Sequence, residues 1–157
     1  MKKCFDDLES LWNYAKKEIK KTMKNEVVEK IKDVEQEVIQ EVVLNAYDSS
    51  YYDRRSESTD GREGLISREN MKPTYMDTKD SISIEMTNDT RGNTYYPNST
   101  NDFIDEIVES GQGYTWKSSE IYKTQQARPF TKETQERLDN SDIIEKTIIR
   151  NSKFEIK

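Results

Sequence analysis

The sequence contains no histidine and only one cysteine among its 157 residues. Histidine is the commonest general base and a common metal ligand, so its absence removes the usual routes to catalysis and metal binding. The single Cys4 can form no disulfide within the chain, and no histidine is present to activate its thiol. We therefore expect no catalytic residue, no cofactor-binding residue and no metal site, and we interpret Cys4 as a small apolar side chain.

Long apolar runs are also missing. No window of 18 apolar residues occurs, which predicts no membrane span, and the basic start of the chain is not followed by the apolar core of a secretory signal. Apolar residues make up 32% of the sequence and charged residues 36%, whereas an average globular protein has roughly half and a quarter. Such a chain buries only a thin core by itself, and assembly into a larger particle would bury more surface. The alternative is a small, well-solvated globular domain.

Negative charge predominates, with a formal net charge of −6. A nucleic-acid-binding protein needs a basic face, so this balance argues against specific DNA or RNA binding. The charge is unevenly distributed, because residues 1–24 carry seven lysines and four acids, while residues 25–47 carry two lysines and six acids. This asymmetry favours head-to-tail contacts between subunits, although a solvated helix surface has the same pattern. We expect the protein to work in a cytoplasm or in a particle assembled there.

Glycine and proline are absent from residues 5–47. Apolar residues recur there every three or four positions, which predicts one amphipathic helical stripe. A single helix of this length would extend about 60 Å, so we predict helices over 6–23 and 25–47 with a break near residue 24, compatible with one collinear axis. Asn25 would cap the second helix. The stripe consists of Phe5, Leu8, Trp12, Ala15, Ile19, Met23, Val27, Ile31, Val34, Val38, Val42 and Ala46.

A polar segment over 48–63 follows and is interpreted as a long surface loop. Beyond Gly64 the pattern changes to strands over 65–76 and 81–86, with the clearest alternation at Ile82, Ile84 and Met86. We therefore predict a small antiparallel sheet packed against the valine-rich helix 25–47, with Pro73 at an edge or a bulge. The fold class predicted is α+β.

Beyond residue 101 the sequence pattern predicts helices. Residues 102–110 fit a short helix that Thr100 or Asn101 would cap and Gly111 would end. Pro129 and Thr131 open a C-terminal helix, which the polar cluster 139–142 would interrupt. A charged tail over 151–157 completes a single domain spanning 1–157.

Nine tyrosines are present, and two of them form the doublet Tyr51-Tyr52, close to Arg54 and Arg55. Tyrosine and arginine are enriched at protein interfaces, since both combine a large contact area with polar groups. This cluster in a long loop therefore suits contacts between subunits. In the alternative interpretation, one tyrosine of the pair covers the core and the other lies on the surface.

Three groups of residues occur in a recognisable order along the chain. The first is Ala46-Tyr47, Tyr51 to Arg55 and Gly64-Leu65; the second is Val108-Glu109-Ser110-Gly111-Gln112-Gly113; the third is Arg128-Pro129-Phe130 before the last helix. Together they resemble the small neck, or tail-completion, proteins of long-tailed bacteriophages. The chain departs from that pattern by a charged insertion over Ser56–Glu63, where a small residue is usual.

The resemblance implies a non-enzymatic virion structural protein at the head–tail junction, which would form a ring around the DNA channel. Its partners would be further copies of itself, most plausibly six, and neighbouring neck, connector or tail-tube proteins. DNA would pass through as cargo, and an acidic lumen would keep it from adhering. The residues that this implies at subunit interfaces are Tyr51, Tyr52, Arg54, Arg55, Glu109, Arg128 and Phe130.

Two other classes of function remain open at this point. One is a small cytoplasmic regulatory or antitoxin-like binding protein. The other is a phage-encoded nuclease, whose metal-dependent form needs an aspartate and a downstream Glu-x-Lys on adjoining strands. The Glu-x-Lys at Glu155-Ile156-Lys157 has no predicted strand pair around it.

Overall fold

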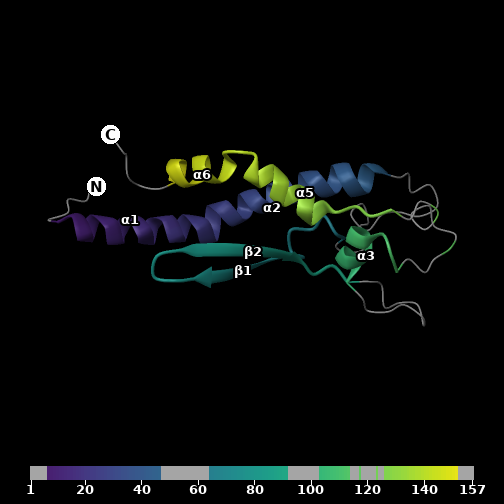
Figure 1. Cartoon of the computed structure of the whole chain (residues 1–157), viewed down its shortest axis with the longest axis horizontal. Coiled ribbons are helices and arrows are strands. Elements are labelled where there is room, and N and C mark those ends of the chain that lie inside the picture. The colour runs from purple at the N-terminus through teal and green to yellow at the C-terminus, as the bar shows by residue number, and fades with distance from the viewer. Residues whose placement is uncertain are drawn as a thin grey trace.

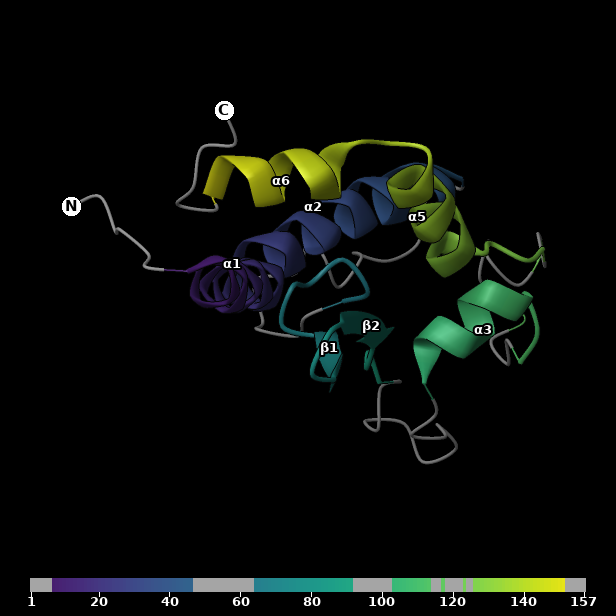
Figure 2. The ribbon, with the colours of Figure 1, turned by 60° about the vertical axis from the view of Figure 1, so that its left-hand side comes forward.

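The computed structural model describes residues 7–46, 64–91, 103–113, 117, 123 and 126–151. One long helix runs through the molecule, composed of α1 (Leu8–Thr22), α2 (Val28–Val38) and shorter turns up to Ala46. A hairpin of β1 (Met71–Asp77) and β2 (Ile82–Asn88) lies along one side of this helix (Figure 1). The helices α5 (Phe130–Asp139) and α6 (Ile143–Asn151) lie along the other side, and α3 (Ile104–Ser110) lies near α5 (Figure 2). The fold is therefore α+β, as the sequence predicts.

Near residue 24, where the sequence predicts a break compatible with one collinear axis, the chain stays helical but changes from α-helical to π-helical geometry. Residues 23–27 form a π-helical turn that joins α1 directly to α2, and Ile39–Val43 form a second one before the final turn Leu44–Ala46. The Asn25 side chain caps nothing, since its amide donates back to the Lys21 carbonyl at 2.9 Å. The physical reason is the spacing of the stripe, whose members from Ala15 to Ile31 are all four residues apart. Such steps drift around an α-helix of 3.6 residues per turn, and a wider π turn absorbs the drift.

The hairpin is antiparallel, with Met71 paired to Asn88 and Asp77 paired to Ile82. The alternation over Ile82, Ile84 and Met86 is confirmed, because these side chains are less exposed than the residues between them. The first strand was predicted to start at residue 65, and this is wrong: residues 64–70 form two successive turns. Their backbone hydrogen bonds are Ser67 to Gly64 and Asn70 to Ser67, at 3.0 and 3.1 Å.

The C-terminal helix is interrupted as predicted, since α5 ends at Asp139 and α6 begins at Ile143. The short helix α3 begins at Ile104, after Phe103, and ends at Gly111, which has a left-handed backbone with φ of 68°. Its predicted capping residues Thr100 and Asn101, the loop 48–63 and the tail beyond Asn151 lie outside the described residues.

The core lies where α2, the start of the hairpin, α3 and α5 meet. Its central side chains come from the predicted helical stripe, and Phe130, Met71 and Val108 close it from the surrounding elements. Ion pairs support it at the surface, because Arg137 of α5 contacts Glu41 at 2.5 Å. The buried apolar residues are Val27, Val28, Ile31, Val34, Val38, Ile39, Val43, Leu65, Met71, Val108, Phe130 and Leu138.

Candidate functional site

Two of the three sequence motifs are brought together in the structure. The end of α3, over 108–113, packs against the segment 126–131 that leads into α5, and we call this contact the α3–α5 junction. The backbone N–H of Arg128 donates to the Val108 carbonyl at 3.0 Å, and the Phe130 N–H donates to the Arg128 carbonyl at 2.8 Å. The motif around Glu109 and the Arg-Pro-Phe motif are therefore parts of one structural unit.

Gly111 permits this close approach. Its φ of 68° lies in the left-handed region, where a side chain is strained. A Cβ at this position would lie 2.4 Å from the carbonyl carbon of Gln126 and 2.6 Å from the amide nitrogen of Ala127. Because both neighbours are backbone atoms, they cannot move aside as the end of a side chain can. Only glycine fits here.

Glu109 supplies the cap that α5 lacks in its own sequence. Pro129 precedes the helix and offers no capping side chain, so the first amides of α5 need another acceptor. The Glu109 carboxylate accepts a hydrogen bond from the Thr131 N–H at 2.6 Å. Its negative charge also lies at the positive end of the helix dipole. Glu109 thus fixes the start of α5 from a position 22 residues earlier.

Arg128 and Phe130 lie inside the subunit. Phe130 is 0% exposed and Arg128 is 1% exposed, and an Arg128 N–H donates to the Gln126 carbonyl at 3.3 Å. Their contacts in the described structure are within the subunit, and neither offers surface to a neighbouring one. Of the other predicted interface residues, Glu109 is half-buried at the junction, and Tyr51, Tyr52, Arg54 and Arg55 lie outside the described residues.

A buried polar network lies beside the junction and was not predicted. Glu35 of α2 is only 5% exposed, and it accepts a hydrogen bond from the Asn88 amide at 3.1 Å. Asn88 also donates to the Leu65 carbonyl at 2.9 Å and accepts from the Thr90 hydroxyl at 2.6 Å. Burial raises the pKa of Glu35 above its ordinary value of 4.5, and the charges of Glu109 and Asp105 add to the rise, while the Asn88 bond and Lys32 oppose it.

The sequence does carry a signal for this network. Glu35 directly follows Val34 of the apolar stripe, and both residues lie on the face of the helix that packs toward the core. A charged residue there indicates either a packing fault or a buried partner. The sequence does not identify the partner, which is Asn88 at the end of β2.

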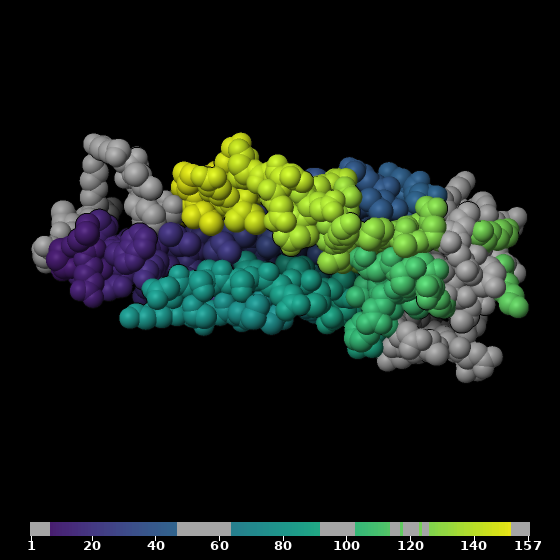
Figure 3. All heavy atoms as spheres, in the orientation of Figure 1, coloured from purple at the N-terminus to yellow at the C-terminus, as the bar shows by residue number. Residues whose placement is uncertain are grey.

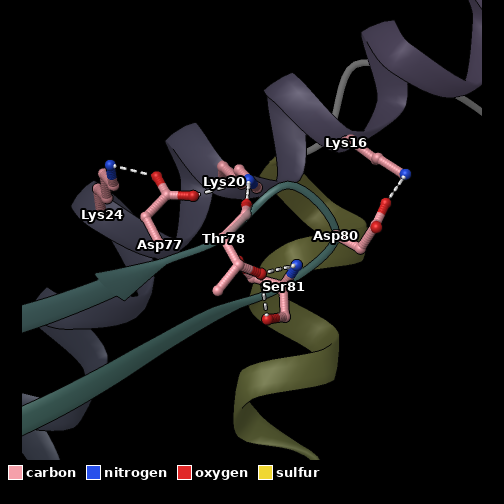
Figure 4. Close-up of polar contacts among 7 residues, drawn as sticks. All are labelled: Lys16, Lys20, Lys24, Asp77, Thr78, Asp80 and Ser81. Carbon is pink, nitrogen blue, oxygen red and sulfur yellow. Dashed lines mark hydrogen bonds and ion pairs between the residues drawn. The ribbon is translucent and has the colours of Figure 1, made fainter.

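The hairpin turn is attached by lysines to α1 and to the π turn that follows it, as Figure 4 shows. Lys20 and Lys24 contact the two carboxylate oxygens of Asp77 at 2.7 and 2.8 Å, and Lys16 contacts Asp80. Lys20 also donates to the Thr78 carbonyl. We call these contacts the lysine clamp. Its sequence signal is the spacing of the three lysines, four residues apart, opposite acids at both ends of the predicted turn.

Hydrogen bonding to the lysines holds the pKa of Asp77 and of Asp80 below the ordinary value of 3.8. Nearer the core, Arg68 contacts Asp33 and Glu29, each at 2.6 Å, and lowers the pKa of Asp33 together with Lys30, whose effect is the larger. Both sets of ion pairs attach the 64–91 segment to the long helix.

A shallow groove of about 610 Å³ lies between the start of α2 and α6. Its walls carry both positive and negative side chains, so their charge favours no single class of ligand. Among the described residues, no group of three or more carboxylate, histidine or cysteine side chains is placed to hold a metal ion. Within the same ranges, no helix has the length and apolar character needed to cross a bilayer. The groove is lined by Lys24, Asn25, Glu26, Glu29, Lys30, Lys146, Thr147, Arg150 and Asn151.

Comparison with known proteins gives one match. No curated protein and no solved structure matches the chain. The sequence model of the YomN family matches residues 7–153, a range that includes every described element and all three sequence motifs. YomN is a phage-derived family, so the match supports the bacteriophage origin that the motif order suggests. The chain belongs to the YomN family.

Proposed function

We propose that this chain is a non-enzymatic structural protein of the phage neck, which forms a ring at the head–tail junction around the DNA channel. The observation that carries the proposal is the α3–α5 junction. The two motifs that meet there are among those on which the resemblance to neck proteins rests, and they fold into one unit held by Gly111, Glu109 and Phe130. Membership in a phage-derived family supports the phage setting.

The shape of the subunit also supports a role in assembly. One end of the long helix packs into the core, from Val27 to Val43, and its other end extends past both the hairpin and α6 (Figure 3). The charged surface and thin core leave much of the subunit without apolar burial of its own. Closed rings arise when head-to-tail contacts between identical subunits return to the start, and otherwise such contacts run on as filaments.

Contacts between subunits are assigned to the loop cluster Tyr51, Tyr52, Arg54 and Arg55. Arg128 and Phe130 support that surface indirectly, because they hold the subunit together from within. Aromatic and arginine side chains dominate the binding energy of most interfaces. The ring is proposed to be a hexamer, in contact with neighbouring neck, connector or tail-tube proteins.

The test is a phage that lacks this gene. We expect its lysates to contain DNA-filled heads and complete tails that do not join, visible by negative-stain electron microscopy, with infectivity restored by the gene supplied in trans. Infectious, fully joined particles in the absence of the protein would refute the proposal.

A finer test concerns the loop. In the complementing copy, Tyr52→Ala with Arg54→Ala should leave the thermal unfolding midpoint unchanged and should prevent joining. The matched control, Ser56→Ala with Ser58→Ala in the same loop, should restore infectivity fully. Normal joining with the Tyr52 and Arg54 variant would remove these residues from the interface.

A further inference from the structure

The first turns of α1 carry an apolar strip that the described elements leave uncovered. Leu8, Leu11 and Trp12, which we call the α1 strip, are 81%, 39% and 60% exposed. Further along the same face of the helix, Ala15 and Ile19 are half-buried. In Figure 3 this end of α1 extends beyond both the hairpin and α6. Three large apolar side chains together on a projecting helix indicate a surface for contact with another molecule.

The charges along α1 are divided between its two halves. Residues 7–15 carry two acids and no base, whereas residues 16–21 carry four lysines and one glutamate. Glu9 and Lys16 are seven positions apart, so they lie on the same side of the helix, beside the strip. Glu9 is exposed and has no ion-pair partner among the described residues. The Lys16 Nζ lies over the Trp12 ring, 5.5 Å from its centroid. The strip is therefore bordered by an acid toward one end and a base toward the other.

A second copy of the chain, running antiparallel, matches both the strip and the charges. When two identical helices pair antiparallel, each flank of the contact faces the same flank of the partner helix. A two-fold axis near Trp12 therefore sets strip against strip and places Glu9 of each copy opposite Lys16 of the other, because Trp12 lies close to midway between them. The acidic half of each α1 then borders the basic half of the other. A nucleic acid or an anionic lipid surface would instead meet the acids beside the strip, so the charges disfavour both.

We propose that two copies of this chain pair antiparallel through their α1 strips, with Glu9 of each copy against Lys16 of the other. The contact uses the same surface on both copies, unlike the head-to-tail contacts of a ring, and it does not rest on the proposed function. Three side chains of this size cover on the order of a few hundred Å², whereas a standard stable interface covers roughly 800 Å² per partner. The pair is therefore weak and dissociates on dilution.

Sedimentation velocity of the full chain over a series of concentrations tests the pairing. Pairing doubles the mass of the unit that the chain forms by its other contacts, whether single subunit or ring, and dilution reverses the doubling. Leu11→Ser with Trp12→Ser should abolish the doubling, and circular dichroism should show an unchanged fold because both side chains are exposed. The matched control on the opposite face of α1, Asn13→Ala with Lys17→Ala, should retain it. Doubling that persists without the strip would overturn the proposal, as would a natural chain whose mass doubles at no concentration.

An exchange of charges tests the antiparallel arrangement. Glu9→Lys sets two lysines against each other in both contacts and should weaken the pairing several-fold, and Lys16→Glu should do the same with two glutamates. Both substitutions in one chain restore opposite charges and should restore the pairing. Lys16→Glu also removes the Asp80 contact within the subunit, so Asp80→Asn is the control and should leave the pairing unaltered. An exchanged chain that pairs no better than the single variants would overturn the arrangement.

Discussion

The long helix is held differently at its two ends. Around Val34 and Val38, buried side chains from α5, α3 and the start of the hairpin surround it, and fixed backbone contacts such as those of Gly111 complete the packing. Around Lys16 to Lys24, the hairpin turn is attached through the exposed lysine clamp. Burial of apolar surface is insensitive to salt, whereas exposed ion pairs are screened and contribute little individually. We therefore expect a rigid end that carries the sequence motifs and a more easily released end at the hairpin turn.

The largest difference between the two ends should appear on truncation of aromatic side chains. Phe130→Ala removes a fully buried ring at the rigid end and should lower the free energy of unfolding by about 3–5 kcal/mol. Tyr75→Ala, in the outer part of the hairpin, removes a ring that is already partly exposed and should cost much less. Urea unfolding followed by circular dichroism measures both, and equal losses would contradict the comparison.

A smaller loss is expected from Gly111→Ala. The new Cβ meets backbone at 2.4 Å and the φ of 68° is strained, so we expect about 2–4 kcal/mol of destabilisation. Gly113→Ala is the matched control, because its φ is 88° but its nearest contact is the Ile107 side chain at 3.3 Å. A Gly113 variant that is destabilised as much as the Gly111 variant would show that backbone strain alone matters and that the close approach does not.

Glu35 should give the rigid end a pH dependence of its own. Its pKa in the folded protein is raised, so the folded state favours the protonated form. The stability it contributes is fully present below its ordinary value of 4.5 and falls as pH rises through the raised pKa. Glu35→Gln keeps an acceptor for Asn88 and should remove this decline. Unfolding measured from pH 4 to pH 8 tests it, with Glu37→Gln on the exposed face as control; parallel curves for both variants and the natural chain would refute the assignment.

The smallest effect on global stability is expected at the lysine clamp. Asp77→Asn should release the hairpin turn and accelerate hydrogen exchange over residues 75–83, with little change in global unfolding. High salt should do the same in the natural chain, because the pairs are exposed. Acid below pH 3.8 should also do so, since the lowered pKa of Asp77 means that its contribution disappears as pH falls through that pKa. Asp139→Asn on α5 is the control and should leave exchange in the hairpin unaltered.

The local parts of the fold could be predicted from the sequence, and the contacts between distant parts could not. Periodicity predicted the long helix, the hairpin alternation at Ile82 to Met86 and the interruption of the last helix. The break predicted near residue 24 rests on Asn25 as a capping residue, which is visible in sequence, whereas the strain that a π turn relieves is not. The sequence pattern over 64–70 predicts strand and misses the turns, because these turns are stabilised by contacts of Arg68 with Asp33 and Glu29 on α2, more than thirty positions away.

The candidate site divides in the same way. The motifs at Glu109 and Arg128 were found from their residues, but their assignment to an interface could not anticipate that Arg128 and Phe130 are buried. Nor does any local pattern indicate that Glu109 caps a helix beginning at Phe130. Such pairings depend on how α3 and α5 approach each other, which only the tertiary structure fixes.

The most direct test of the neck proposal is to locate the protein in the virion. Purified particles should contain it by mass spectrometry, and cryo-electron microscopy of the head–tail junction should contain a ring into which the long helix, the hairpin and the α3–α5 junction fit. Absence of the protein from infectious particles, or density for it at another position in the virion, would contradict the proposed function.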